Sequence, residues 1–395
     1  MGRPESLGSR SSSVSRLGRR RLDRRVDHDR RASRRHTVCR ATRRASQDQL
    51  EGASRHRRQW AGSQLRRWGP RARRWGYDRR RDSGGGRPCA EVHLCRHRQG
   101  ELVSSFGVIV VDKPEGPTSH NVVSIVRRGT GVRKVGHAGT LDPRASGVLV
   151  LCLGPATRLS EYLSTSKKIY AARIRFGEST KTYDAEGETT SFAGELPSEA
   201  QIESALDTFR GEIQQIPPPY SAVKIQGRKA YELARAGKPV KLDPRSVTVY
   251  ELKVLDYQPP DLSIRVECSA GTYIRSLAHD LGAALSTGAH LVALRRLKAG
   301  HFGLEHAARL ETLEAAMRRG EWQSWLLPAS EALPDFPIVT VEKPELEKIR
   351  NGQRIPARYQ ATGMARALGQ DGELVAILES VEHGREWQPR KVFLS

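Results

Sequence analysis

The chain has 395 residues, which predicts two or three domains, and a formal net charge of +23. Residues 1–100 hold 29 Arg, no Lys and 9 Asp or Glu, so the rest of the chain carries only +3. The net charge therefore does not identify the folded part as a nucleic-acid binder. No apolar run reaches 18 residues and no apolar signal core precedes a cleavage site, which favours a soluble, cytoplasmic protein.

Residues 1–104 are predicted to be a disordered, Arg-rich extension, because runs such as GRRRLDRRVDHDRRASRRH show no sustained apolar period. Three interpretations compete: a basic RNA-binding tail, an organellar transit peptide, or upstream sequence translated from a wrongly assigned start. We favour the third, because a GC-rich reading frame encodes Arg without Lys, and lysine first appears at Lys113. Leu102 or Val103 would then mark a non-standard initiation codon.

Three of the five cysteines, Cys39, Cys89 and Cys95, lie in this extension. Cys89 and Cys95 stand with two histidines in CAEVHLCRH, whose spacing matches no usual zinc pattern. Cys152 and Cys268 lie in apolar, strand-like runs and are expected to be buried, reduced thiols. We expect no metal site.

The folded part is predicted to begin with a buried strand at Phe106–Val111, stopped by two X-Pro pairs. The next segment, HNVVSIVRRGTG, predicts a helix with Ser119 as its N-cap and a glycine at its end. VGHAGTLDPRASG is then expected to be a loop and VLVLCLG a strand. ATRLSEYLSTS predicts a helix capped by Thr157.

The following segments alternate between strand and helix patterns. KIYAARIRFG predicts a strand, and PSEAQIESALDTFRGEI predicts an amphipathic helix that starts at Pro197 and Ser198. IPPPYSAVKIQGRKAYELARAGKPV combines a proline-rigid loop, a short strand and a short helix. SVTVYELKVLDYQ and LSIRVECSAGTYIR are expected to pair as antiparallel strands, before a helix in YIRSLAHDLGAAL.

Several adjacent strands and the lack of a steady βαβ rhythm predict an α+β fold with a mixed, largely antiparallel sheet flanked by helices. The pattern changes near Pro328. Residues 328–395 are expected to form a small β-rich domain, after a larger domain at 105–327.

Several common catalytic motifs are missing. Gly131 and Gly136 have the spacing of a phosphate-binding loop, but His137 and Ala138 follow where Lys and Ser or Thr are needed. Neither HExxH nor GxSxG occurs. Nucleotide hydrolysis, zinc protease chemistry and serine hydrolase chemistry therefore have no support.

Asp142 stands alone in GHAGTLDPRASGVLVLCLG, between a small-residue turn and an apolar run. Such an aspartate is usually a turn former or a helix cap, but at the mouth of a buried strand it can be a nucleophile. A glycosidase-like mechanism would need a second carboxylate, which the motif lacks. The local sequence leaves these alternatives open.

Four segments occur together, in the order GHAGTLDPRASGVL, KIYAARIRFGESTKTYDAEGE, PPPYSAVKIQGRKAYELAR and GTYIRSLAHDLG…HLVALRRL. Over about residues 105–310 they resemble the TruB-type tRNA pseudouridine synthases. The C-terminal part resembles the PUA-like RNA-binding domain that follows the catalytic domain in that family. The first hundred residues have no counterpart there. The resemblance implies the pseudouridine-synthase fold.

The resemblance implies an isomerase that converts uridine-55 in the T-loop of tRNA to pseudouridine. The reaction needs neither cofactor nor metal, because it involves no redox change and no net hydrolysis. The resemblance also implies that Asp142 is the nucleophile and that Arg275 pairs with it. A guanidinium can keep a carboxylate ionised and hold it in one orientation. Whether the attack falls on C1′ of the sugar or on C6 of the base stays open.

The target base must be flipped out of its loop and held in a pocket. By resemblance, Tyr170 and Tyr273 are the pocket tyrosines and Leu294 lines the uracil site. Tyr170 is also assigned to the catalytic residues, because one tyrosine could move the proton that leaves C5. His137 matches the histidine that takes the place of the departing base.

Asp184 in KTYDAEGE could orient an arginine or cap a turn, and we favour the turn. Five cations are expected to contact phosphates of the RNA, which adds affinity that weakens with salt. These residues are Lys113, Lys224, Arg228, Arg295 and Arg296. The tRNA is the only partner expected, held by its T-arm and acceptor arm, and nothing in the sequence demands more than a monomer. Two alternatives stay open: an RNA-binding protein or tRNA chaperone, and a pseudouridine synthase that acts on another RNA.

Overall fold

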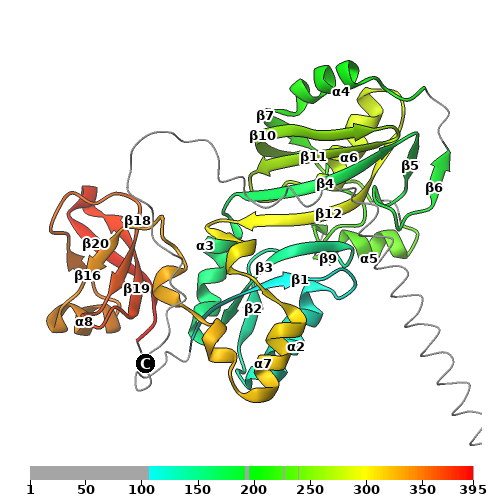
Figure 1. Ribbon diagram of the computed structural model, residues 1–395. Helices are drawn as coiled ribbons and strands as arrows, with labels where there is room; N and C mark the ends of the chain where they lie inside the picture. Colours follow the sequence, from blue (N-terminus) through cyan, green and yellow to red (C-terminus); the bar gives the residue numbers. More distant parts are fainter. Residues whose placement is uncertain (1–105, 192–194, 226, 239, 395) are drawn as a thin grey trace, which may run out of the picture. The chain divides into compact units, whose positions relative to one another are not determined.

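The structure is a computed structural model that describes residues 106–191, 195–225, 227–238 and 240–394 (Figure 1). The predicted extension at 1–104 lies outside the described residues, and so do Cys39, Cys89 and Cys95. Cys152 and Cys268 are buried free thiols, as expected. Among the described residues, no helix combines the length and the apolar character needed to cross a membrane.

An eleven-stranded sheet forms the larger part of the fold. Its main path runs through β14 (Ala308–Arg309), β1 (Gly107–Lys113), β3 (Ala145–Leu153), β12 (Ala289–Ala299), β4 (Lys168–Phe176), β11 (Asp261–Cys268), β10 (Arg245–Gln258) and β7 (Gly211–Gln215). Off this path lie β2 (Val135–His137), β13 (Phe302–Gly303) and β15 (Leu327–Pro328). Only β1–β14 and β3–β12 are parallel pairs in the described part of this sheet. The prediction of a mixed, largely antiparallel α+β sheet is confirmed.

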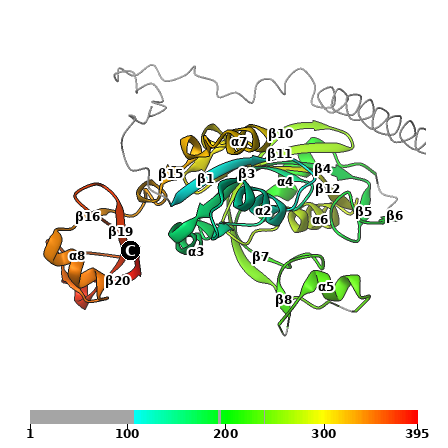
Figure 2. The same ribbon diagram turned by 90° about the horizontal axis from the view of Figure 1, so that it is seen from below.

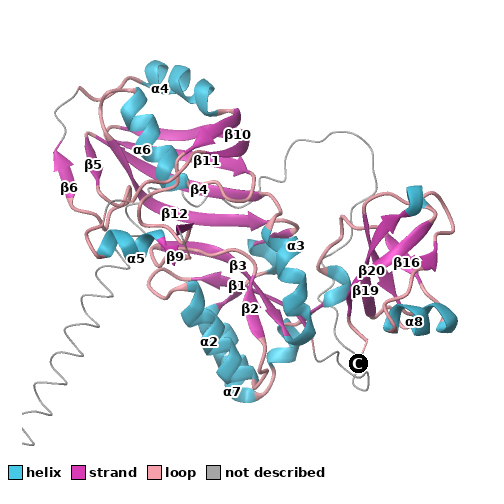
Figure 3. Cartoon of the chain, turned by 180° about the vertical axis from the view of Figure 1, so that it is seen from behind, coloured by secondary structure: helices cyan, strands magenta, loops and turns pink. Residues whose placement is uncertain are grey.

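Helices cover the sheet in two groups (Figures 1 and 2). α2 (Ser119–Thr130) and α7 (Leu310–Arg319) lie side by side and bury their apolar stripes against β1 and β3. α4 (Glu199–Leu206) and α6 (Ile274–Ala284) pack on β4, β10 and β11. The sheet thus has two halves, one with β14, β1 and β3 and the other with β4, β11, β10 and β7. The burial of apolar area is the main stabilising contribution in each half. β12 lies between β3 and β4, where the two halves of the sheet meet (Figure 3).

Short elements connect these parts. They are the 3₁₀ helices η2 (Gly154–Leu159), η3 (Asp207–Phe209), η4 (Leu304–His306), η5 (Trp322–Trp325) and η6 (Ala329–Glu331), the helix α3 (Ser160–Ser164), the pair β5 (Glu178–Thr180) and β6 (Thr189–Ser191), and the pair β8 (Lys224–Ile225) and β9 (Arg228–Lys229) with α5 (Ala230–Arg235).

A separate five-stranded sheet follows towards the C-terminus. Its order is β16 (Ile338–Thr340), β18 (Met364–Leu368), β19 (Leu374–Val381), β20 (Glu386–Val392) and β17 (Ile355–Pro356), with α8 (Lys343–Arg350) and the 3₁₀ helix η7 (Glu382–Gly384). Buried residues such as Val341, Ile349 and Trp387 give it an apolar cluster of its own. The expected small β-rich C-terminal part is therefore present.

Three predicted helix ends were wrong. The N-cap of α2 is Thr118, which forms a capping box with Asn121, and Ser119 is buried inside the first turn. The segment around Thr157 begins with the 3₁₀ helix η2, which starts at Gly154, so Thr157 lies inside this helix and is not its N-cap. α4 does start behind Ser198, but it ends at Leu206, because the last predicted residues pair with β10 as strand β7.

Candidate active site

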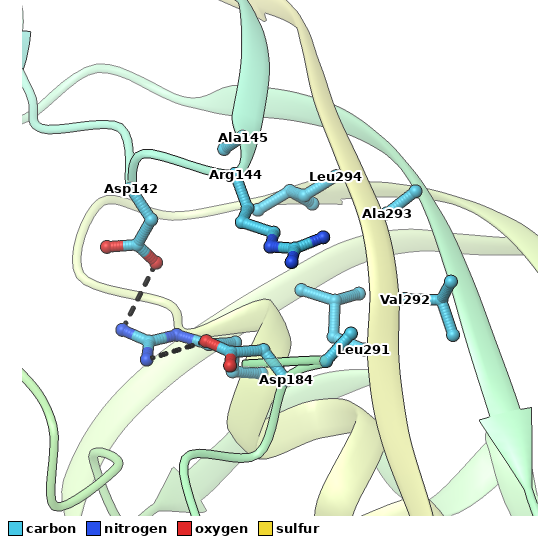
Figure 4. Close-up of a pocket in the computed structure, with 10 residues that line it drawn as sticks. Asp142, Arg144, Ala145, Asp184, Leu291, Val292, Ala293 and Leu294 are labelled. Carbon is cyan, nitrogen blue, oxygen red and sulfur yellow. Dashed lines mark hydrogen bonds and ion pairs between the residues drawn. The ribbon is translucent and has the colours of Figure 1, made fainter. Parts of the chain in front are cut away.

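A cleft of about 720 Å³ opens between the two halves of the large sheet. Its walls come from the loop between β2 and β3, from β4, from the segment after β5, from residues 220–222, from the first turn of α6 and from β12. Asp142, Asp184, Arg275 and Leu294 also line a narrower pocket beside the cleft (Figure 4). The sequence thus brings four distant segments to one place.

The loop that carries Asp142 is fixed by hydrogen bonds to the buried side chain of Ser119, in the first turn of α2. The Ser119 hydroxyl accepts a hydrogen bond from the Leu141 amide (2.8 Å) and donates one to the Leu141 carbonyl (2.9 Å). Leu141 itself is buried, and the Ala145 amide donates to the Asp142 carbonyl (3.0 Å) where β3 begins. Sequence reasoning missed Ser119 as a support of the loop, because it was assigned to the helix cap.

Arg275 joins two carboxylates. Its Nη2 lies 3.1 Å from Oδ2 of Asp142, and its Nη1 lies 3.2 Å from Oδ2 of Asp184, as the dashed lines that start at the two aspartates show (Figure 4). Nη2 also donates to the Tyr220 carbonyl (3.1 Å). The Arg275 side chain is 9% exposed, whereas the Asp142 side chain is 45% exposed. The guanidinium is therefore fixed, and the carboxylate of Asp142 still faces the cleft.

Opposing effects act on the pKa of Asp142. Burial raises it above the usual range of an aspartate, and the positive charge of Arg275 opposes that shift. The negative charges of Asp184 and Glu186 add to the rise. Arg275 therefore carries the charge that favours the ionised form of Asp142 in a site that otherwise disfavours it.

Asp184 serves both roles that the sequence left open. Its Oδ1 accepts hydrogen bonds from the Thr182 hydroxyl (2.6 Å) and from the Glu186 amide (3.1 Å), which closes a local turn. Its other oxygen holds Arg275. The prediction that Asp184 only forms a turn was too narrow. The partner of its second oxygen, Arg275, lies far away in the sequence.

Tyr170, Tyr273 and Leu294 line the cleft. Tyr170 pairs across the sheet with Arg296, and burial raises the pKa of its hydroxyl while the charge of Arg296 opposes the shift. Burial also raises the pKa of Tyr273. Both rings are therefore apolar walls with a protonated hydroxyl at their tip.

His137 lies at the end of β2 and is half-buried. Its Nδ1 has no hydrogen-bond partner among the described residues. Burial, together with the charges of Arg296 and His120, lowers the pKa of His137, so its imidazole is neutral at pH 7. A neutral ring is suited to stacking against a base. The described residues include no group of three or more His, Cys, Asp or Glu that would hold a metal ion.

Two of the five predicted phosphate-binding residues are in the wrong place for that role. Lys113 is fully buried, and its ammonium donates to the carbonyls of Pro114, Pro117 and Pro143 at 2.9, 2.9 and 3.2 Å. Burial lowers the pKa of Lys113 to about 8. Arg296 is 1% exposed. The prediction was wrong because neither cation reaches the surface.

Arg296 instead braces the loop that carries Asp142. Its Nε donates to the Val148 carbonyl (2.7 Å), and its two terminal nitrogens donate to the carbonyls of Thr140 (3.3 Å) and Gly139 (3.0 Å). A buried cation is costly unless its hydrogen bonds are made, and here backbone carbonyls make them. The sequence HLVALRRL does not indicate that Arg296 is buried while its neighbour Arg295 is partly exposed.

The three remaining cations are at least partly exposed. Arg295 points to the other side of β12 from Arg296, because successive strand residues alternate, and it pairs with Asp112 at 2.8 Å. Lys224 and Arg228 are exposed on the β8–β9 hairpin. Their contact with RNA stays a prediction.

Comparison with known proteins agrees with this site. The profile described as TruB family pseudouridylate synthase (N terminal domain) matches residues 127–274, and the tRNA pseudouridylate synthase B C-terminal domain matches 275–333. The second sheet lies beyond both matches, so its PUA-like nature stays a prediction.

Relatives named tRNA pseudouridine synthase B occur in many bacteria. The one from Solibacter usitatus is 49% identical over 70% of this chain and 96% of its own length. The one from Dechloromonas aromatica is 43% identical over 73% of this chain and 96% of its own. A chain from the crystal structure of a Cbf5-Nop10-Gar1 complex has a TM-score of 0.58 and 30% identity, over 73% of this chain and 85% of that one. This chain therefore belongs to the TruB family of pseudouridylate synthases.

Proposed function

We propose that this protein isomerises uridine-55 in the T-loop of tRNA to pseudouridine, with Asp142 as the nucleophile. The observation that carries the proposal is the Asp142 carboxylate, which faces the cleft while a buried arginine holds it. The relatives named tRNA pseudouridine synthase B support tRNA as the substrate.

The chemistry is an isomerisation in which atoms and charges balance. The bond between C1′ and N1 of the uridine breaks, a bond between C1′ and C5 forms, C5 loses a proton and N1 gains one. A carboxylate suits this reaction, because it can add to the nucleotide and then leave. Attack at C1′ and attack at C6 both need the same ionised Asp142.

Arg275 supplies the charge and the orientation for that step. Its guanidinium holds Asp142 with one nitrogen and Asp184 with the other, so the carboxylate has one fixed direction. Asp184 keeps Arg275 in place when the nucleophile forms a covalent bond and loses its negative charge. Preorganisation of this kind lowers the reorganisation needed during the reaction.

The uracil is held by apolar walls. The cleft volume falls in the range of about 300–1,000 Å³ that is usual for small-ligand sites, so a flipped nucleotide fits. Tyr170, Tyr273 and Leu294 supply the walls, and stacking on an aromatic ring contributes about 1–3 kcal/mol per base. We assign the transfer of the C5 proton to the Tyr170 hydroxyl, beside the charge of Arg296. His137 fills the space that the base leaves in the RNA.

The insert between β7 and β10 supplies an exposed basic surface. Its exposed cations are Lys224, Arg228, Arg235, Lys238 and Lys241. Arg235 also lines the cleft, so this surface continues into the site. We assign to this surface the binding of phosphates of the T-arm, and to the C-terminal sheet the binding of the acceptor arm. On this proposal the protein acts as a monomer in the cytoplasm.

The test uses the full-length protein and an unmodified tRNA transcript with tritium at C5 of its uridines. Pseudouridine formation releases that tritium, and mapping of the product gives the position. We expect release from one uridine in the T-loop and none from a transcript with cytidine at position 55. Modification of a different uridine, or of ribosomal RNA alone, would contradict the assigned substrate.

A further inference from the structure

Gln215, the last residue of β7, is almost fully buried and bonds a distant piece of backbone. Its exposed fraction is 2%. Its Oε1 accepts a hydrogen bond from the Tyr273 amide (2.7 Å), and its Nε2 donates to the Tyr273 carbonyl (3.1 Å). One side-chain amide therefore satisfies both backbone groups of a residue in the cleft wall.

Tyr273 is the N-cap residue of α6, and no side chain of its own caps the helix. Its carbonyl accepts the first helical hydrogen bond, from the Leu277 amide at 3.1 Å. The position of Tyr273 therefore sets where α6 starts and which way its first turn faces. Gln215 fixes that position from strand β7, since it bonds both backbone groups of Tyr273.

The residues after Gln215 make further bonds to the same turn. The Ser276 hydroxyl donates to the Ile216 carbonyl (2.7 Å), and Arg275 donates to the Tyr220 carbonyl (3.1 Å). Residues 217–219 are all proline, so the segment between these contacts is stiff. The segment 215–220, which we call the strap, is thus fastened to the start of α6 at both ends.

We propose that Gln215 is a positioning residue for the isomerisation: through Tyr273 it sets the wall of the uracil site and the place of the Arg275 guanidinium. The inference rests on the proposed function, and it goes beyond that function because Gln215 is not among the residues that line the cleft. A group that acts through Tyr273 and Arg275 changes the rate of the chemical step more than the binding of RNA, which contacts other surfaces.

The test compares two adjacent glutamines in the full-length protein. Gln215→Leu keeps the size of the side chain and removes both hydrogen bonds. Gln214→Leu is the matched control, because Gln214 is exposed on the opposite face of the same strand. For each variant we would measure the single-turnover rate at saturating enzyme, the Kd for tRNA and the melting temperature.

We expect Gln215→Leu to lower the single-turnover rate at least tenfold, with the Kd for tRNA within threefold of wild type. Gln214→Leu should change neither quantity by more than twofold. A folded Gln215→Leu variant with the rate of the control would overturn the inference, and so would a loss of rate matched by an equal loss of tRNA affinity.

Gln215→Glu provides the second variant in case the leucine variant does not fold. A protonated carboxyl can accept from the Tyr273 amide and donate to the Tyr273 carbonyl, whereas an ionised one cannot donate. Its rate relative to wild type should therefore be higher at pH 6 than at pH 8.5, or be close to wild type throughout if the buried group stays protonated. A ratio that is lower at pH 6 than at pH 8.5 would overturn the inference.

Wild-type activity separates this inference from the proposal on which it rests. An inactive wild-type protein would overturn the proposed function and this inference with it. An active wild type with an equally active Gln215→Leu variant would overturn the role of Gln215 alone.

Discussion

The carboxylate of Asp142 and the guanidinium of Arg275 lie 3.1 Å apart, although one follows β2 and the other belongs to the first turn of α6. Arg275 is buried, and a second aspartate on its other nitrogen restrains it further. The pair therefore combines a fixed cation with an accessible anion. Because Asp142 is the more exposed partner, it can meet a nucleotide while its orientation is retained.

Replacement of Asp142 by Asn should abolish pseudouridine formation, because the amide keeps the shape and loses the negative charge. Tritium release should be undetectable, and the Kd for tRNA should stay within a few-fold of wild type. The melting temperature should not fall, since burial disfavours the ionised carboxylate in the folded protein. Asp256→Asn, at an exposed aspartate of β10 outside the cleft, is the control. Clear residual turnover would remove Asp142 as the nucleophile.

Arg275→Met should be more disruptive than Arg275→Lys. Methionine leaves two carboxylates close together without a cation, and loss of one partner of a buried ion pair typically costs about 3–5 kcal/mol. Lysine keeps the charge but cannot form the planar contacts to both aspartates and the Tyr220 carbonyl.

Thermal unfolding and single-turnover rates would test this order. We expect the lysine variant to fold with a rate at least a hundredfold lower, and the methionine variant to melt at a lower temperature. A lysine variant as active as wild type would show that the geometry of the guanidinium is not needed.

The rate should fall on the acid side at a higher pH than an ordinary aspartate would give. The pKa of Asp142 is raised from 3.8 by burial, so this carboxylate takes up a proton before a solvated one does as the pH drops. Only the ionised form attacks, so activity is lost as the pH falls through that raised value. A single-turnover pH profile measures the midpoint. A midpoint below 3.8, with the protein still folded, would contradict the assignment.

Two lysines should behave in opposite ways, because one is buried and the other is exposed. Lys113→Met removes the donor to three carbonyls, so it should lower the melting temperature and leave the salt dependence of tRNA binding unchanged. Lys224→Met should leave the melting temperature unchanged and weaken tRNA binding. It should also reduce the slope of log K against log salt by about 0.7–0.9 if it contacts one phosphate. Binding measured at several salt concentrations checks both.

The neighbours Arg295 and Arg296 offer a second matched pair. Arg296→Met leaves three carbonyls beneath the nucleophile loop without donors, at about 1–3 kcal/mol for each unsatisfied group. It should therefore lower both the melting temperature and the rate. Arg295→Met loses a partly exposed ion pair, usually worth about 0–1 kcal/mol. Equal effects of the two changes, measured by thermal unfolding and tritium release, would contradict this difference.

Much of the fold followed from periodicity alone. The alternation in β4, β10 and β11, the apolar run of β3 and the capping signal before α4 were all readable, since they depend on neighbours in the chain. The motifs around Asp142 and Arg275 also predicted, by resemblance, that these two residues pair, and the structure places them 3.1 Å apart. Each of these signals lies within a single strand, helix or loop, so it can be read from residues that are close in the sequence.

The tertiary structure decided which polar groups are buried. Lys113 and Arg296 resemble other basic residues in sequence, and only the packing of β1, β3 and β12 shows that carbonyls surround them. Asp184 needed a partner from another element before its second role was visible. Gln215 carries no local signal, because its two bonds go to a residue far along the chain. Sequence determines which groups can form hydrogen bonds, but the approach of distant segments determines which of them lose water and must pair with each other.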